Sequence, residues 1–248
     1  MKIEKILIAQ PAPANGSPYS EIISKYGVRV DFHPFCKLET ISAREFRAQR
    51  ISILDYTAIV FTGRSTIDAF FKICDELRVT IPDSMKYFCV SEAVAMYLQK
   101  HIVYRKRKVF FGDGTPSSII SLIGPKHKGE KFLIAQSDNA SHDLENMLNA
   151  AGLETNTAVF IKTVYADMKD IDIRSYQMIV FYSPSDIKSL LESYPDFKQE
   201  NMLFATFGKP TAKAMAECGL KIEVEAPTPE APSIAKALSL YLAGKDGE

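Results

Sequence analysis

Short turns rich in hydroxyl residues and glycine follow several apolar runs of this 248-residue chain. Where such a turn ends a buried strand and starts a helix, its N–H and O–H groups favour anions. These turns therefore predict binding sites for a ligand that carries several carboxylates. Helix capping is the alternative for every Ser and Thr among them, and it stays open. The residues predicted to take part are Thr62, Gly63, Arg64, Ser65, Ser91, Ser183, Pro184, Ser185, Gly208, Lys209 and Thr211.

The stretch 204–238 shows this arrangement most fully. It predicts a buried strand, a turn at Gly208, a helix over residues 210–218, a further strand near Ile222 and a final helix. A proline in the first turn of the helix and a glycine just after its end support these limits. We expect a row of free backbone N–H groups over residues 208–212, where the helix begins.

The usual signatures of nucleophilic and metal catalysis are absent from the sequence. It contains no G-x-S-x-G segment, and no G-x-G-x-x-G segment follows the first apolar run. Lysine plus arginine equals aspartate plus glutamate at 30 each, so no net charge favours nucleic acid or a membrane surface. The histidines lack metal-ligand spacing, and we expect no metal site. They are His33, His101, His127 and His142.

The cysteines and the N-terminal segment indicate the cellular compartment in which the protein works. The four cysteines show no C-x-x-C spacing and stand in apolar settings, so we expect reduced core residues. The apolar run within residues 1–10 is too short for the core of a signal peptide or for a membrane span. We therefore expect a cytoplasmic protein. The cysteines are Cys36, Cys74, Cys89 and Cys218.

Apolar runs alternate with helical segments along the whole chain, which predicts an α/β fold with parallel sheets and helices on both faces. Several segments recur at similar separations. The tetrapeptide Leu-Ile-Ala-Gln at residues 7–10 returns unchanged at residues 133–136, and the segment 60–67 resembles 180–187. Such self-similarity predicts two similar lobes.

The order of the repeats indicates that one lobe is inserted into the other. The first strand and helix precede the second lobe, whereas the partners that complete their lobe come after residue 170. We expect a first lobe from residues 1–36 and 166–248, and a second lobe from residues 39–162. The chain would cross near residues 34–38 and 161–166 as a two-stranded hinge, with a ligand bound in a cleft.

Five segments of the chain resemble segments of the uroporphyrinogen-III synthase family, and they occur in the same order along the sequence. Phe-Tyr-Ser-Pro-Ser at residues 181–185 is similar to the family's F-x-S-P-S turn, and residues 207–212 resemble its I-G-x-x-T-A segment. Residues 226–229 resemble its A-x-x-P-T-P loop, residues 61–63 stand at its F-T-S turn, and Val-Tyr at residues 164–165 at its inter-lobe strand. The likeness covers nearly the whole chain.

The resemblance implies a fold and a reaction. The fold is a pair of flavodoxin-like lobes, each a parallel sheet flanked by helices, joined by a two-stranded ladder. The reaction is closure of the linear tetrapyrrole hydroxymethylbilane to uroporphyrinogen III, with loss of water and inversion of the last pyrrole ring, which makes the protein a lyase. The resemblance implies no cofactor, a monomer, and no nucleic-acid or membrane partner.

It also suggests roles for single residues. Tyr165 is the candidate for assisting departure of the hydroxyl by donating a hydrogen bond, and Thr211 for binding a substrate carboxylate. Packing between the lobes is the alternative for Tyr165. Three positions depart from the family pattern. Gly63 lacks the second hydroxyl of its Thr-Ser turn, Val94 stands where some members have Thr, and the Arg often found near Ser141 is absent.

Two other functions stay open beside the synthase. These departures favour a non-catalytic relative that binds a tetrapyrrole or another polyanion. A two-lobed small-molecule sensor of the periplasmic-binding type is a third hypothesis, which the absent signal sequence and the inserted-lobe order disfavour.

Overall fold

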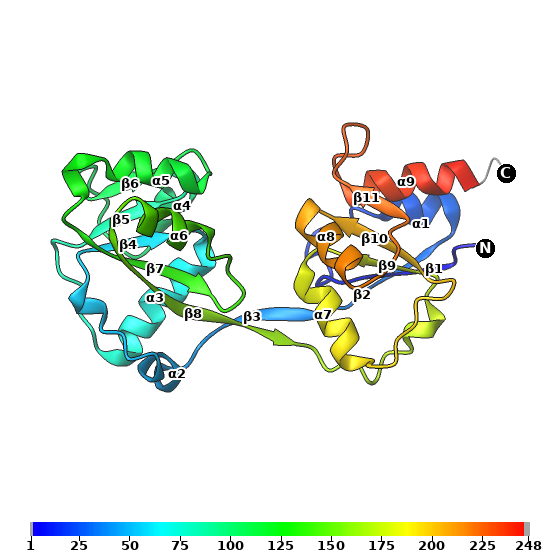
Figure 1. Cartoon of the computed structure of the whole chain (residues 1–248). Coiled ribbons are helices and arrows are strands. Elements are labelled where there is room, and N and C mark those ends of the chain that lie inside the picture. The colour runs from blue at the N-terminus through cyan, green and yellow to red at the C-terminus, as the bar shows by residue number, and fades with distance from the viewer. Residues whose placement is uncertain (1, 246–248) are drawn as a thin grey trace. The chain divides into compact units, whose positions relative to one another are not determined.

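The computed structural model describes residues 2–245 of the chain. The chain divides into two compact units (Figure 1). The first unit combines the two ends of the chain, up to Lys37 and from Val164 onward, and the second unit is Leu38–Thr163.

The first unit is built on a five-stranded sheet in which all the recorded pairings are parallel. The strand order is β11-β10-β9-β1-β2. Helices α1 and α9 pack on one face beside Ile6 and Ile8, and helices α7 and α8 pack on the other beside Leu7. The elements are β1 (Lys5–Ile8), α1 (Ser20–Tyr26), β2 (Arg29–Phe32), η3 (Ile173–Ser175), β9 (Met178–Phe181), α7 (Pro184–Ser193), β10 (Leu203–Phe207), α8 (Lys209–Glu217), β11 (Val224–Ala226) and α9 (Ile234–Lys245).

The second unit contains a six-stranded sheet with the order β3-β8-β7-β4-β5-β6. Helices α2, α3 and α4 pack on one face beside Ile59 and Phe61, and helices α5 and α6 pack on the other beside Ala58 and Val60. The elements are β3 (Cys36–Thr40), α2 (Ala43–Ala48), η1 (Ile53–Asp55), β4 (Ala58–Phe61), α3 (Arg64–Leu77), β5 (Lys86–Cys89), α4 (Glu92–Leu98), β6 (Val109–Phe111), α5 (Pro116–Ile123), η2 (Pro125–His127), β7 (Lys131–Ser137), α6 (Asp143–Ala150) and β8 (Glu154–Tyr165).

The two sheets share one strand order once the insertion is taken into account. The row β2-β1-β9-β10-β11 of the first unit corresponds to the row β8-β7-β4-β5-β6 of the second. In the first unit this is the flavodoxin-like order 2-1-3-4-5. The repeated Leu-Ile-Ala-Gln tetrapeptides fall on the equivalent strands β1 and β7: residues 7–10 run past the end of β1, and residues 133–136 lie within β7. The predicted fold class, two similar lobes with parallel sheets flanked by helices, is confirmed.

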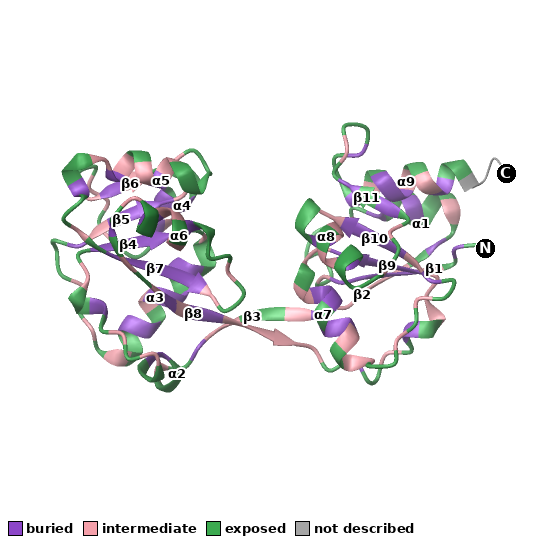
Figure 2. Ribbon diagram, in the orientation of Figure 1, coloured by how far each residue is buried: buried purple, intermediate pink, exposed green. Residues whose placement is uncertain are grey.

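The strands form where the sequence supplies runs of β-branched and aromatic residues that both faces of a sheet bury. Strands β4 and β9 are buried along their whole length (Figure 2). Apolar runs at residues 58–61 and 178–181 predict these two strands, and the structure gives the same limits, Ala58–Phe61 and Met178–Phe181. The spacing Ser-x-x-Glu at residues 42–45 predicts a capping box, and the structure shows one at the start of α2.

Some local predictions are wrong, and others are confirmed with limits shifted by one or two residues. Ser17 followed by Pro18 predicts a helix that Ser17 caps and that begins at Pro18, but α1 begins at Ser20, because the Ser17 hydroxyl instead closes a turn by accepting from the Tyr19 amide. The strand expected near Ile222 is β11, which begins two residues later. The helix expected over residues 210–218 is α8, which lies one residue earlier. Cys74 and Cys89 are core residues, but Cys36 is half-buried and Cys218 is exposed.

Two extended segments carry the chain from one unit to the other. The boundaries fall after Lys37, within β3, and after Thr163, within β8. The Ala166 amide donates to the Phe35 carbonyl at 2.9 Å, so the residues that flank the two strands in the first unit are bonded to each other. Across residues 2–245, no helix combines the length and the apolar character needed to cross a membrane.

Candidate functional site

The predicted turns lie at the carboxyl ends of parallel strands. In the first unit the chain order reverses between β1 and β9, and in the second unit the equivalent reversal lies between β7 and β4 (Figure 1). Ligands of open α/β sheets bind in the crevice outside such a reversal. The turn 183–185 follows β9 and the turn 62–65 follows β4, so each adjoins the reversal of its own sheet.

The turn after β9 is held by a capping box at the start of α7. The Ser183 hydroxyl accepts from the Asp186 amide at 3.3 Å, and the Asp186 carboxylate accepts from the amides of Ser183 at 2.8 Å and Tyr182 at 3.0 Å. Capping is therefore the observed role of the Ser183 hydroxyl. Pro184 is exposed, and the amide and hydroxyl of Ser185 have no partner in the described part of the chain.

Asp186 is a member of this turn that was not predicted as a site residue. Its side chain is only 3% exposed, and this burial raises the pKa of the carboxyl, against the opposing effect of the bonds it accepts. The signal that would have found it is the spacing Ser-x-x-Asp, the acidic form of the capping box that was recognised at Ser42.

Two tyrosines contact each other just after the end of β9, on the face of the sheet that α1 and α9 cover, opposite to α7. The Tyr182 hydroxyl lies 2.7 Å from the hydroxyl of Tyr19, and the Tyr182 ring lies 5.6 Å from that of Phe207 at the end of β10. Burial raises the pKa of both phenols, and at Tyr19 the contact to the second phenol adds to the effect. Both phenols therefore stay neutral at ordinary pH, and they form a structural support under the turn.

The turn at Gly208 differs from its prediction. Gly208 has φ 88°, in the region that favours glycine, and its amide donates to Ala226 at 2.7 Å. The amides of Thr211 and Ala212 both donate to the Gly208 carbonyl at 3.1 Å, and proline at position 210 has no N–H. The expected row of free N–H groups is therefore wrong, because the tight turn brings the Gly208 carbonyl under the first helical turn.

Fewer hydrogen-bond donors are available to a ligand at this turn than the sequence predicts. Among positions 208–212, only the Lys209 amide has no acceptor within residues 2–245, and the Lys209 side chain is exposed. Thr211 is only 2% exposed, so its side chain faces the interior of the unit. Lys209 is thus the member of this turn best placed for a ligand.

Tyr165 is the last residue of β8 and is half-buried. The Lys188 amine of α7 lies 5.5 Å from the centre of its ring, a cation–π contact. The Tyr165 hydroxyl has no hydrogen-bond partner among the residues described. The ring is thus held from one side while the phenol stays free to act as a donor. Lys188 and Tyr165 lie far apart in sequence, on α7 and at the end of β8, so no local sequence pattern links them.

In the second unit, the turn after β4 starts α3 without a side-chain cap. Gly63 is the N-cap residue, and the amides of Arg64 and Ser65 have no acceptor in the described structure. Thr62 and Ser65 are exposed, and the Arg64 side chain also reaches solvent. An uncapped helix start with an arginine in its first turn favours an anion.

Arg64 is oriented by its neighbours on α4. Its guanidinium lies 5.6 Å from the centre of the Tyr97 ring, and the Tyr97 hydroxyl donates to Asp68 at 2.7 Å. Asp68 in turn lies 2.8 Å from His101. The Arg64 guanidinium therefore rests on a connected set of side chains.

Ser91 has a mainly structural place. It precedes α4 without a side-chain cap, and it forms an isolated backbone bridge with Asp113 of the turn after β6. Val94, at the equivalent of Thr211, is buried. Asp138 lies in the turn 137–139 at the end of β7, and its carboxylate accepts from the Thr163 amide at 3.0 Å, which ties this loop to β8.

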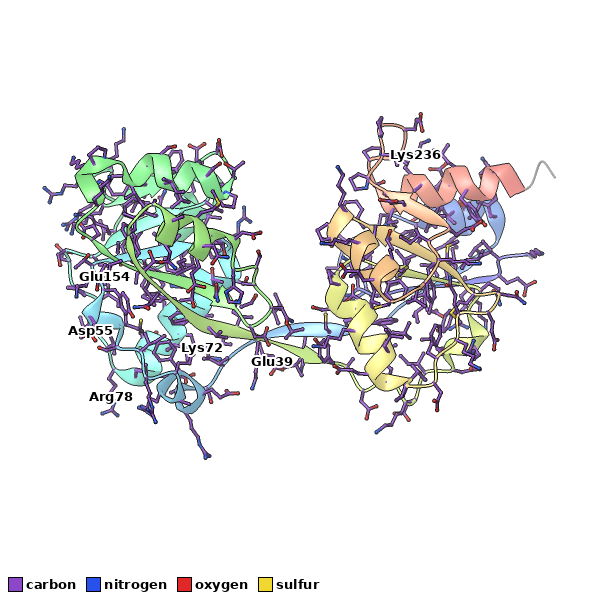
Figure 3. All side chains as sticks on the ribbon, viewed as in Figure 1. Glu39, Asp55, Lys72, Arg78, Glu154 and Lys236 are labelled. Carbon is purple, nitrogen blue, oxygen red and sulfur yellow. The ribbon has the colours of Figure 1, made fainter. Side chains whose placement is uncertain are left out.

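The candidate residues form two sets, one in each unit. The first unit brings together the turns at 183–185 and 208–211 with Tyr165, and the second carries the turn 62–65 and Ser91. The cavities of about 410, 390, 290 and 500 Å³ lie instead beside segments that precede strands, at the opposite ends of the sheets. Figure 3 draws the side chains of the described residues. Within residues 2–245, no three metal-ligating side chains gather into a possible metal site.

Comparisons with known proteins agree with this architecture. A family model described as Uroporphyrinogen-III synthase HemD matches residues 17–236. A mutant uroporphyrinogen III synthase from the extremely thermophilic bacterium Thermus thermophilus has a similar structure, with a TM-score of 0.61 at 15% identity over 99% of this chain and 100% of that one. Uroporphyrinogen-III synthetase from Helicobacter pylori has a TM-score of 0.59 at 16% identity over 97% of this chain and 99% of that one. These two likenesses show the shared fold.

No curated protein matches the chain. The family match nevertheless spans most of the chain and includes the turns at 62–65, 183–185 and 208–211. The chain therefore belongs to the uroporphyrinogen-III synthase family, a family of enzymes of tetrapyrrole biosynthesis.

Proposed function

We propose that this protein cyclises hydroxymethylbilane to uroporphyrinogen III, with loss of water and inversion of the last pyrrole ring, and is thus a lyase. The family match over residues 17–236 is the observation that carries the proposal. The site geometry is compatible with it, because donors for carboxylates and a free phenol stand at the carboxyl ends of the strands.

The chemistry begins with loss of hydroxide from the hydroxymethyl group, driven by the electron-rich pyrrole. The resulting azafulvene is attacked by the substituted α-carbon of the last pyrrole ring to give a spiro intermediate, which breaks the bond from that carbon to the neighbouring ring. The last ring then recloses, inverted, through its free α-carbon, which loses its proton. The hydroxyl leaves as water once it gains a proton, so a donor near it lowers the barrier. Tyr165 takes this role in our proposal, since its hydroxyl is free and the Lys188 contact holds its ring.

Recognition of the substrate carboxylates falls to groups that the fold leaves unpaired. In the first unit these are the amide and hydroxyl of Ser185 and the amide and amine of Lys209. In the second unit they are the Arg64 guanidinium and the first amides of α3. The enzyme's contribution is then to hold a flexible chain in a reactive arrangement.

The decisive experiment is an isomer assay. Purified protein is incubated with freshly prepared hydroxymethylbilane, and the oxidised products are separated by chromatography. We expect the type III isomer, whereas a boiled sample gives the type I isomer of spontaneous closure. Only type I product with native protein contradicts the synthase.

A non-catalytic tetrapyrrole binder is the second candidate, favoured by the uncapped helix start at Gly63 and the apolar Val94. It predicts binding of uroporphyrinogen III without any type III product from hydroxymethylbilane. Within the synthase proposal the protein works in the cytoplasm as a monomer and without a cofactor. Size-exclusion chromatography with light scattering, and activity after exhaustive dialysis against a chelator, test the last two points.

A further inference from the structure

Helix α7 contacts both segments that carry the chain between the units. Its first turn forms the predicted ligand turn after β9, and its next residues reach the start of β3 and the end of β8. The ligand turn and the two linking segments are therefore attached to one short helix.

Asp186 makes the first of these attachments. One of its carboxylate oxygens accepts from the amides of Tyr182 and Ser183, and the other accepts from the Cys36 thiol at 3.3 Å. Burial and the nearby carboxylate raise the pKa of the Cys36 thiol to about 12, so the thiol keeps its proton and acts as the donor. Cys36 is the first residue of β3.

The attachment continues from Cys36 to Tyr165 through its neighbour. The Phe35 carbonyl accepts from the Ser189 hydroxyl of α7 at 2.6 Å and from the Ala166 amide at 2.9 Å. Ala166 directly follows Tyr165, whose ring rests against Lys188 of the same helix. A continuous set of contacts thus runs from the ligand turn through Asp186 and the start of β3 to the phenol.

We propose that Asp186 is a positioning residue, which fixes the turn 182–185 and the start of β3 on α7 and so sets where the Tyr165 hydroxyl lies relative to Ser185. The role rests on the proposed synthase function. Asp186 does not contact substrate, because its side chain is buried beneath the turn. Small displacements of a donor in a site of this kind reduce the rate strongly.

Two substitutions separate the two contacts of Asp186. Asp186→Asn keeps one oxygen for the amides of Tyr182 and Ser183 but presents an NH₂ donor to Cys36. Cys36→Ala removes only the thiol. For each variant we expect kcat to fall about ten-fold with KM within about two-fold of the parent value, because the ligand turn stays capped while the phenol shifts.

The double variant and a matched control complete the design. Because both changes break one contact, Asp186→Asn with Cys36→Ala should be no slower than the slower single variant. Lys236→Ala, a change on α9 labelled in Figure 3 and remote from these contacts, should leave kcat and KM unchanged. A folded Asp186→Asn protein with the parent kcat, or losses that multiply in the double variant, would overturn the proposal.

Amide hydrogen exchange keeps the test independent of activity. We expect faster exchange of the Ala166 amide in both single variants, since its acceptor Phe35 precedes the released Cys36. If native protein yields no type III product, the synthase proposal fails, and unchanged Ala166 exchange would separately overturn the positioning role. If Asp186→Asn does not fold, the Cys36→Ala variant decides alone: faster Ala166 exchange with a lower kcat supports the positioning role, and parent values of both overturn it.

Discussion

At the scale of single residues, Tyr165 combines a restrained ring with an unrestrained hydroxyl. The Lys188 amine stabilises the ring orientation, whereas the phenol oxygen makes no hydrogen bond in the described part of the protein. A residue kept only for packing needs no hydroxyl at this place. The hydroxyl can therefore be removed without leaving a buried group unpaired.

Tyr165→Phe should lower kcat for type III product about a hundred-fold, because it removes the proton donor. The free energy of unfolding should change by less than about 0.5 kcal/mol, since the hydroxyl has no partner to lose. Steady-state kinetics and chemical denaturation measure the two quantities. Tyr104→Phe, which also removes a phenol without a recorded hydrogen bond, is the control. Parent-like kcat, or a large loss of stability, would support packing as the role of Tyr165.

At the scale of elements, the strand-to-helix turns use their backbone donors differently. Helix α7 is capped by Ser183 and Asp186, and α8 turns its first amides back onto Gly208. Helix α3 has no side-chain cap and presents its first amides outward. A hydroxyl-rich turn after a strand therefore does not by itself indicate an anion site. The side chains at the third helical position and the φ of the cap residue decide how many donors remain.

The contacts of η2 with β5 and β6 predict a pH-dependent stability. His127 is 5% exposed and lies between Phe88 and Phe110, with centroid distances of 5.5 and 4.7 Å. Burial lowers its pKa, helped by the charges of Lys86 and Lys126 and opposed by that of Glu130. The folded protein therefore takes up this proton at lower pH than the unfolded chain does, whose histidine pKa is about 6.5.

Stability should accordingly fall as pH drops below about 6.5, because the unfolded state gains the proton first. His127→Phe should flatten this dependence between neutral and mildly acidic pH, as seen in chemical denaturation at a series of pH values. His142→Phe, at an exposed site, should keep the parent slope. An unchanged slope in the His127 variant would show that the buried imidazole does not cause it.

At the scale of the whole molecule, the second unit is continuous in sequence while the first is not. Both apolar cores of the second unit consist of residues between Ile41 and Ile161. The cores of the first unit draw on both ends of the chain. The second unit therefore has its whole core within one continuous segment, whereas the first unit needs both ends of the chain.

A fragment of residues 38–163 should fold by itself, because it retains both of its cores and all of β4 to β7. We expect a cooperative thermal transition by circular dichroism and dispersed amide resonances. A fragment of residues 38–130 lacks β7 and β8 and exposes the edge of β4, so it should not fold. A non-cooperative transition for the longer fragment would contradict this account.

Much of the fold could be predicted from the sequence, because its signals are local. Aliphatic runs such as 58–61 and 178–181 were recognised to the residue, and the box at Ser42 and Glu45 predicted the start of α2. The repeats indicated two similar sheets, which the shared strand order bears out. The predicted helix start near Ser17 was wrong because a capping residue can also close a turn without starting a helix. The strand predicted near Ile222 begins two residues later, because the limits of a short apolar run are poorly defined in sequence.

The sequence by itself thus determined the α/β class, the repeated order of the elements and the turns that follow the strands, since these depend on residues a few positions apart. Only the tertiary structure decided which donors in those turns remain free. It joined Asp186 to Cys36 across 150 positions and placed Lys188 on Tyr165. Hydrogen bonds and ring contacts between such distant residues depend on the packing of α7 against the sheet, and no local pattern encodes them.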